Sequence, residues 1–284
     1  MQIITWNIQA AKGVDNVTSV ERIASVTKDL ADADIICYQE VFNGEINGKA
    51  VNQVEALAGH FPKHRPIFGA AINRAQRESN TTGTGRLQFG NLVLSRLPVE
   101  QISLHRLPQP AQAGIACMPR QAVELLLPWQ DQIFRVVTTH LDFFAADQRS
   151  AQTRYLQDWH RQTLDRAQFP GAQGGELQFA SLPETDLSIY CGDFNFNVDS
   201  TDYKLLTQGG RSSNSVLIDC WRHVNAHTPH DPTCGIFDQI QWTEGPHCRD
   251  FFFASSALAD RVKRVTVDTE TNASDHQPLL LTLS

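Results

Sequence analysis

Ser188-Ile189-Tyr190-Cys191-Gly192-Asp193-Phe194-Asn195 is the stretch of this 284-residue sequence that decides the fold. Its first residues are nearly all apolar, which is typical of a β-strand covered on both faces. Gly192 permits a close approach of the backbone, and Asp193 and Asn195 then share one face of an extended segment. Asp-x-Asn alone is also typical of a turn. The stretch predicts a buried strand that delivers a carboxylate and an amide to the edge of a sheet.

Other apolar runs end in the same way, on a residue that can hold a metal or a phosphate. They are Ile3-Ile4-Thr5-Trp6-Asn7, Ile35-Ile36-Cys37-Tyr38-Gln39-Glu40 and Val136-Val137-Thr138-Thr139-His140, and Ser274-Asp275-His276 precedes the last expected strand. Together these endings supply Asn, Glu, His, Asp-x-Asn and Asp-His. That set of side chains predicts hydrolysis of a phosphate ester on a hard divalent cation.

Each ending has a role that its chemistry favours. Glu40 is the only acid in residues 35–42, and a lone glutamate at the end of an apolar strand is a good Mg²⁺ ligand. Asp193 can take a proton from an attacking water, while Asn195 can orient that water or hold a phosphoryl oxygen. His140 and His276 can flank a phosphate and stabilise the developing charge.

Asp250 opens the apolar run Asp250-Phe251-Phe252-Phe253-Ala254. A carboxylate at the start of such a strand is costly to bury alone. We expect it to pair with His276 and fix its tautomer. A salt bridge to Arg249 or Arg261 is the alternative.

The periodicity of the chain predicts two β-sheets packed face to face with helices outside. Expected strands are 2–7, 34–40, 66–72, 90–95, 121–127, 133–140, 187–192, 215–218, 250–254, 261–267 and 279–283, and expected helices are 18–30, 50–60, 146–167 and 200–208. The polar segment 73–89 is expected to be a loop, either a surface connector or a lid that faces the substrate.

Composition indicates a folded protein and narrows its partners. Hydrophobic residues make up 41% and charged residues 19%, with a net charge of −7 and no Lys/Arg-rich tract. Avid nucleic-acid binders usually carry a basic stripe, so we expect no processive nucleic-acid binder here. No apolar run approaches the ~20 residues of a membrane span. The first residues show no basic region or cleavage site, so we expect no signal peptide and a cytoplasmic location.

Six cysteines in a chain of this length do not predict a disulfide scaffold. Cys220, Cys234 and Cys248 share a stretch with His223, His227, His230 and His247, which leaves a zinc site as an alternative. No C-x-x-C pair occurs there, so the loop and core interpretation is favoured.

Taken in chain order, these segments resemble the endonuclease/exonuclease/phosphatase family, which includes pancreatic-type deoxyribonucleases, neutral sphingomyelinases and 5′-tyrosyl-DNA phosphodiesterases. The matching segments are Thr5-Trp6-Asn7, Tyr38-Gln39-Glu40, 89–96, Thr139-His140-Leu141, Gly192-Asp193-Phe194-Asn195, 249–253 and Ser274-Asp275-His276. They span nearly the whole chain. The resemblance is to bacterial members of undefined substrate, and it implies one domain over residues 1–284 with a four-layer α/β/β/α sandwich.

The resemblance also implies a role for each site residue and Mg²⁺ or Mn²⁺ as cofactor. Asn7 and Glu40 look like the metal-side pair, with Asp275 as an auxiliary carboxylate. Asp193 looks like the activator of the water, with Asn195 as its partner. His140 looks like a phosphate stabiliser, and Asp250 like the residue that orients His276.

The substrate is less defined, because the sequence has no basic insertion of the kind that grips duplex DNA. Arg120, Arg149 and Arg249 are candidate phosphate contacts, and the stretches 140–154 and 232–250 are expected to shape the leaving-group side. The main hypothesis is a monomeric phosphodiesterase of nuclease type that attacks phosphorus in line with water. A phospholipid or small-molecule phosphoesterase is one alternative. A non-catalytic regulator that binds RNA or protein on the same fold is the other.

Overall fold

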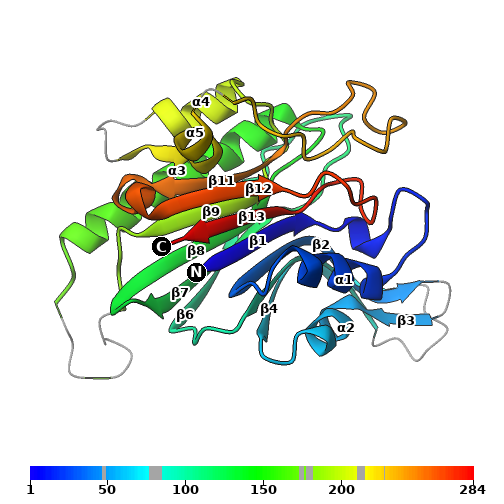
Figure 1. Ribbon diagram of the computed structural model, residues 1–284, viewed down its shortest axis with the longest axis horizontal. Helices are drawn as coiled ribbons and strands as arrows, with labels where there is room; N and C mark the ends of the chain where they lie inside the picture. The colour runs from blue at the N-terminus through cyan, green and yellow to red at the C-terminus, as the bar shows by residue number, and fades with distance from the viewer. Residues whose placement is uncertain (47–48, 77–84, 173–175, 177–181, 210–214, 227) are drawn as a thin grey trace.

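The expected strands form two β-sheets packed face to face, with helices on the outer faces (Figure 1). The computed structural model describes all residues except 47–48, 77–84, 173–175, 177–181, 210–214 and 227. Within this part of the chain the four-layer α/β/β/α arrangement predicted from the sequence is confirmed.

The first sheet joins the two ends of the chain. Its order is β12-β13-β1-β2-β5-β4, with β3 paired to β2. Parallel pairing of β1 with β2 places Asn7 opposite Gln39, so Asn7 and Glu40 reach the same edge of the sheet. The strands are β1 (Gln2–Asn7), β2 (Ile35–Ile46), β3 (Lys49–Asn52), β4 (Arg65–Ala75), β5 (Arg86–Ser95), β12 (Val262–Val267) and β13 (Leu279–Leu283).

The second sheet has the order β10-β11-β9-β8-β7-β6. Parallel pairing of β8 with β9 sets His140 opposite Asp193, and antiparallel pairing of β11 with β9 sets Asp250 opposite Asp193. Three of the predicted site residues therefore lie abreast on neighbouring strands. The strands are β6 (Gln101–Arg106), β7 (Gln121–Trp129), β8 (Gln132–His140), β9 (Ser188–Asp193), β10 (Leu217–Asp219) and β11 (Asp250–Ser255).

The alternation of side chains along each strand divides the core into three parts. Ile3 and Cys37 of the first sheet pack with Val136 and Cys191 of the second in the layer between the sheets. Outward-facing residues of the first sheet pack on α1 (Val20–Leu30) and α2 (Gln53–His60). Those of the second pack on α3 (Ala146–Gln168) and α4 (Thr201–Gln208), and α5 (Cys220–Asn225) lies near β11 and β12. Burial on both faces explains why the central strands are apolar throughout.

Several elements differ from the sequence prediction at the edges of the sheets. Strand β6 was not expected, because its Ile102 and Leu104 are exposed and alternate with polar residues on an edge strand. The helix predicted over 50–60 begins at Gln53, because residues 49–52 pair with β2 as strand β3. Of the expected loop 73–89, residues 73–75 belong to β4 and residues 86–89 to β5. Its residues 77–84 lie outside the described part of the chain. No helix among the described residues is long and apolar enough to cross a membrane.

One buried histidine of α3 makes the stability of the fold depend on pH. His160 is buried with its ring edge-on to Tyr190, 5.5 Å between centroids, and neither ring nitrogen has a hydrogen-bond partner. Burial, together with the charge of Arg135, lowers the pKa of His160 from 6.5 to about 4. The unfolded chain therefore binds a proton between pH 6.5 and pH 4 that the folded protein does not.

We predict that this proton destabilises the folded protein as pH falls through that window. At pH 5 the cost is about 2 kcal/mol of unfolding free energy. His160→Phe keeps an aromatic ring in place and removes the titration. Between pH 7.5 and pH 5 its unfolding free energy should therefore fall by about 2 kcal/mol less than that of the parent. Urea unfolding at both pH values measures the difference. Equal pH dependence of the two proteins would contradict the assignment.

Candidate active site

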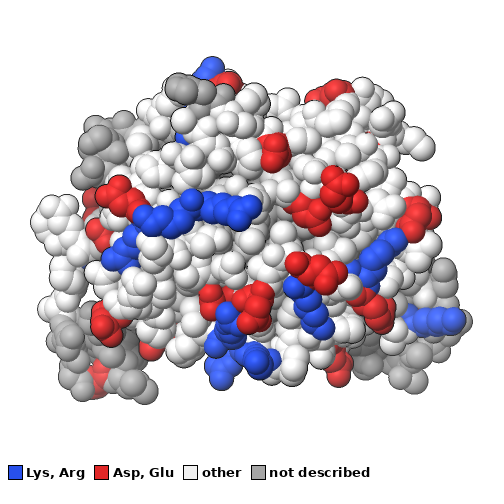
Figure 2. Space-filling view, in the orientation of Figure 1, with Lys and Arg blue, Asp and Glu red and all other residues white. Residues whose placement is uncertain are grey.

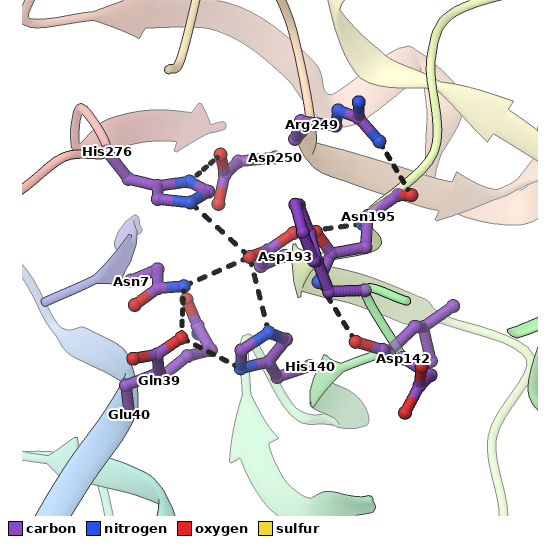
Figure 3. Close-up of polar contacts among 12 residues, drawn as sticks. Asn7, Gln39, Glu40, His140, Asp142, Asp193, Asn195, Arg249, Asp250 and His276 are labelled. Atoms are coloured by element: carbon purple, nitrogen blue, oxygen red, sulfur yellow. Dashed lines mark hydrogen bonds and ion pairs between the residues drawn. The ribbon is translucent and has the colours of Figure 1, made fainter. Parts of the chain in front are cut away.

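The polar strand ends of both sheets converge on one cleft of about 670 Å³ (Figure 3). It opens where the two sheets face each other, so that side chains far apart in the sequence lie around it. The predicted residues that line it are Asn7, Glu40, Arg120, His140, Asp193, Asn195, Asp275 and His276.

Asp193 is the centre of the hydrogen-bond network. Its Oδ2 accepts a hydrogen bond from Asn7 Nδ2 at 3.0 Å, and its Oδ1 accepts one from the Asn195 backbone N–H at 2.9 Å. The Nε2 atoms of His140 and His276 lie 3.4 and 3.6 Å from Oδ2. Burial raises the pKa of Asp193 to about 7, although the neighbouring His276 acts in the opposite direction. A carboxylate with this pKa can take up a proton near neutral pH.

His276 is held by the carboxylate of Asp250. Its Nδ1 lies 2.8 Å from Asp250 Oδ2, which leaves Nε2 directed toward Asp193. Thr233 Oγ1 donates a second hydrogen bond to the same Asp250 oxygen at 2.6 Å. The alternative partners do not contact Asp250, since Arg249 donates to Asn195 O and Arg261 to Gln130 and Gln132.

The two histidines of the site have opposite electrostatic surroundings. Burial lowers the pKa of His140 well below 6.5, and Arg120 and His276 lower it further. Burial also acts to lower the pKa of His276, but the carboxylates of Asp250, Asp193 and Asp275 outweigh it and raise the pKa well above 6.5. Near neutral pH, His140 is therefore neutral and His276 carries a proton.

On the first sheet, Glu40 and Asp275 form an acidic wall. Burial raises the pKa of Glu40, and the charge of Asp275 adds to that effect. Glu40 Oε1 accepts from Asn7 Nδ2 at 3.2 Å, and Asp275 Oδ2 accepts from Gln241 Nε2 at 2.9 Å. Two neighbouring carboxylates, together with amide groups, form the oxygen-rich environment that a hard divalent cation neutralises. The donor set therefore fits Mg²⁺ or Mn²⁺.

A second group, Asp193, Asp250 and His276, brings its possible ligand atoms within 4.8 Å of one another. In that group His276 Nδ1 is already bonded to Asp250. The oxygen set around Glu40 is therefore better suited to a hard cation.

The backbone has an unusual conformation at two of the predicted site residues. Glu40 has φ 60° and Asn195 has φ 52°, in the left-handed region. At Glu40 this accompanies a break in the pairing of β2 with β5 between Tyr38 and Val41. Such strained positions persist only where the surrounding structure determines them.

Arg120 supplies a buried cation to the cleft. It is 6% exposed, and its nearest acid is Asp142, at 3.7 Å between Nε and Oδ2. Its Nε and Nη1 have no hydrogen-bond partner. A buried guanidinium with unused donors is suited to an oxyanion.

The other two candidate arginines do not line the cleft. Arg149 Nη1 donates to the backbone carbonyls of Asp142 and Phe143, both at 3.0 Å. Arg249 Nη1 donates to Asn195 O at 2.9 Å, and its guanidinium lies 5.6 Å from the ring of Trp242. The structure thus places both behind the wall of the cleft, where they hold loops in position.

Several lining residues were not predicted individually. Phe143 and Phe144 belong to a stretch that was expected to shape the leaving-group side, and their apolar character directly after a polar strand end was the available signal. Gln241 and Trp242 carried no such signal, because they come from an irregular loop. The remaining ones are Gln9, Phe89, Ala116, Cys117, Met118 and Asp142.

The zinc alternative finds no support among the described residues. Cys220, Cys234 and Cys248 are buried, and within the described part of the chain the one cluster with metal-ligand spacing is that of Asp193, Asp250 and His276. Cys234 Sγ contacts His247, at 3.3 Å from Nε2 and 3.5 Å from the backbone oxygen. His227 is outside the described residues.

Gly192 has a backbone conformation and a close backbone neighbour that leave no room for a side chain. Its φ is +131°, and a Cβ there would run into the backbone carbonyl of Thr139. We predict that Gly192→Ala destabilises the protein by about 3 kcal/mol or more. Gly171→Ala is the matched control, because a Cβ at Gly171 meets nothing within 4 Å. Chemical unfolding of the two variants provides the comparison, and equal stability would show that β8 and β9 can separate at no cost.

Comparison with known proteins agrees with this geometry. The sequence model described as "Endonuclease/Exonuclease/phosphatase family" matches residues 4–276, a range that includes every residue of the cleft described above. The search of curated proteins gave no match.

Solved structures resemble the chain over its full length. An endonuclease/exonuclease/phosphatase from Beutenbergia cavernae has a TM-score of 0.66 at 21% identity, covering 100% of this chain and 72% of that one. The mannosyl-6-phosphatase of Bacteroides thetaiotaomicron has a TM-score of 0.70 at 19% identity, covering 100% and 99%. A truncated Caenorhabditis elegans TDP2 has a TM-score of 0.63 at 19% identity, covering 99% and 96%. At these identities the likeness shows a common fold.

Proposed function

The chain belongs to the endonuclease/exonuclease/phosphatase family, and we propose that it is a Mg²⁺- or Mn²⁺-dependent phosphoester hydrolase of the phosphodiesterase or nuclease type. One observation carries the proposal: Asp193 lies between Asn7, His140 and His276 in a cleft that also contains the unpaired donors of Arg120.

The cation would be held by Glu40 and Asp275, with the amide of Asn7 beside them. When bound, it supplies positive charge that offsets the charge developing on the phosphoryl group. Burial and the charge of Asp275 both raise the pKa of Glu40, and a bound cation would offset both effects.

Asp193 acts as the base that takes a proton from the attacking water. Its two oxygens are fixed by Asn7 and by the Asn195 backbone, so the carboxylate is oriented before the substrate binds. Asn195 Oδ1 is buried without a partner, and it can accept a hydrogen bond from the same water. Water then attacks phosphorus in line with the departing oxygen.

His276, His140 and Arg120 stabilise the phosphoryl oxygens. Protonated His276 is fixed by Asp250 and Thr233, and it supplies positive charge without reorganising. His140 is neutral and therefore donates one hydrogen bond. Arg120 provides the unused guanidinium donors.

We predict that Asp193→Asn and His276→Gln each lower kcat at least about 100-fold, because one removes the base and the other the positive charge. A panel of phosphoesters with Mg²⁺ and Mn²⁺ measures this, including plasmid DNA, single strands, a 5′-tyrosyl oligonucleotide, sphingomyelin and bis-p-nitrophenyl phosphate. Thermal melting confirms that each variant is folded. Near-normal turnover by both folded variants would refute the assignment.

The metal ligands are tested separately from turnover. Titration calorimetry with Mn²⁺ should show at least about tenfold weaker binding for Glu40→Gln and for Asp275→Asn. Asp158→Asn is the control, since this acid lies on the exposed face of α3 beside Arg161. Removal of the cation with EDTA should abolish hydrolysis, and Mn²⁺ should restore it. Undiminished Mn²⁺ binding by both variants would place the metal elsewhere.

The alternatives make different predictions in the same assays. A non-catalytic regulator would bind no metal and hydrolyse no member of the panel, and the full set of acids and histidines in the cleft disfavours it. A phospholipid esterase would favour sphingomyelin.

A cytoplasmic location and a monomeric state complete the proposal. All six cysteines are free, as is usual in a reducing compartment.

A further inference from the structure

A row of aromatic rings leads from the catalytic centre to the outside of the cleft. Trp242 packs edge-on against His276 at 5.4 Å between centroids, and Phe143 packs edge-on against Trp242 at 5.5 Å. Phe144 continues the row, 4.7 Å from Phe143. Both phenylalanines and Trp242 line the cleft. A group attached to a phosphate beside His276 would therefore lie next to aromatic side chains.

The row ends on a side chain that is largely exposed. Phe144 is 64% exposed, although it lines the cleft, while Trp242 is 3% exposed. The turn that carries Phe143 is fixed from behind by the two hydrogen bonds of Arg149. Ala116, Cys117 and Met118 line the same cleft from another loop. The aromatic surface is thus preorganised and apolar.

The charges of the loops around the cleft disfavour a polyanion. Segments 107–119, 141–147 and 228–248 contain no lysine or arginine, but they include the acids Asp147, Asp238 and Glu244. On the face shown in Figure 2, the loop before β11, at the upper right, shows acidic and uncharged atoms and no basic ones. Among the described residues that line the cleft, Arg120 is the only lysine or arginine. Polynucleotides are held through several phosphate contacts, which these loops do not supply.

From these observations we propose that the substrate is a phosphoester with a single phosphate and an uncharged, planar aromatic ester group that packs against Phe144 and Phe143. This inference rests on the proposed hydrolase function and narrows its substrate class to small phosphoesters in place of nucleic acids. The P–O bond opposite the attacking water breaks. Water supplies the oxygen that stays on phosphorus and the proton that the leaving oxygen takes up.

An aromatic group suits this surface better than an aliphatic chain. The rings of the row meet edge to face, with interplanar angles of 86° and 88° at Phe143. Rings arranged in this way leave faces and edges free for one more ring, and aromatic pairs gain more than their buried area alone provides.

The test uses binding rather than turnover, so that it is independent of the reaction. Titration calorimetry in the presence of Mg²⁺ compares three non-hydrolysable probes: methylphosphonate, hexylphosphonate and naphthylmethylphosphonate. The naphthyl probe should bind about tenfold more tightly than the other two. Phe144→Ala should remove most of that preference. Phe169→Ala is the matched control, because Phe169 is equally apolar, 71% exposed, and lies at the end of α3 outside the cleft.

The outcomes separate the inference from the proposed function. Naphthyl binding no tighter than methyl or hexyl binding, or a preference that survives Phe144→Ala, overturns the aromatic subsite. An eight-nucleotide single strand that binds more tightly than the naphthyl probe, with a steep salt dependence, overturns the single-phosphate class in favour of a polynucleotide. If the naphthyl preference is present and no phosphoester is hydrolysed, the subsite is retained and the hydrolase function fails.

Discussion

The hydrogen bond from Asn7 Nδ2 to Asp193 Oδ2, 3.0 Å long, joins the two sheets at the cleft. Asn7 ends β1 of the first sheet and Asp193 ends β9 of the second, so the bond exists only if the sheets pack in one register. Gln39 reinforces this register from behind, because its side chain donates to Thr5 of its own sheet and to Thr138 of the other. Charges on the two sides of the cleft then face each other at distances that the apolar layer below has set. The site is therefore a consequence of how the sandwich packs.

The strand-end pattern made much of this predictable. Apolar runs that end on polar residues identified the buried strands. Parallel neighbours such as β1 and β2 bring their ends to the same edge of a sheet. Hydrogen bonding between Asp250 and His276 was also expected, because a carboxylate at the start of an apolar strand needs a partner. These inferences succeed because they depend on local sequence and on the cost of burying charge.

The contacts of the loops were not predictable, because they depend neither on local sequence nor on the cost of burying a charge. Arg149 and Arg249 looked like phosphate contacts, yet each donates to backbone carbonyls that any residue type could provide. Trp242 reaches His276 from a segment without periodicity. Edge elements such as β3 and β6 escaped detection because one of their faces is exposed, which weakens the hydrophobic pattern. A hydrogen bond from a side chain to a backbone carbonyl depends on where both lie in the folded chain, so the amino-acid types alone do not reveal it.

The anchoring of the loops by main-chain oxygens has an evolutionary consequence. Arg149 holds the turn that carries Phe143 and Phe144 through the carbonyls of residues 142 and 143, and these acceptors remain whatever side chains the turn bears. Side chains at 143 and 144 can therefore drift without loss of the anchor. The strand ends that are proposed to activate the attacking water belong to the sheets and are not affected by such drift. New specificities can arise on this scaffold by exchange of a few exposed residues, while the proposed catalytic residues stay unchanged.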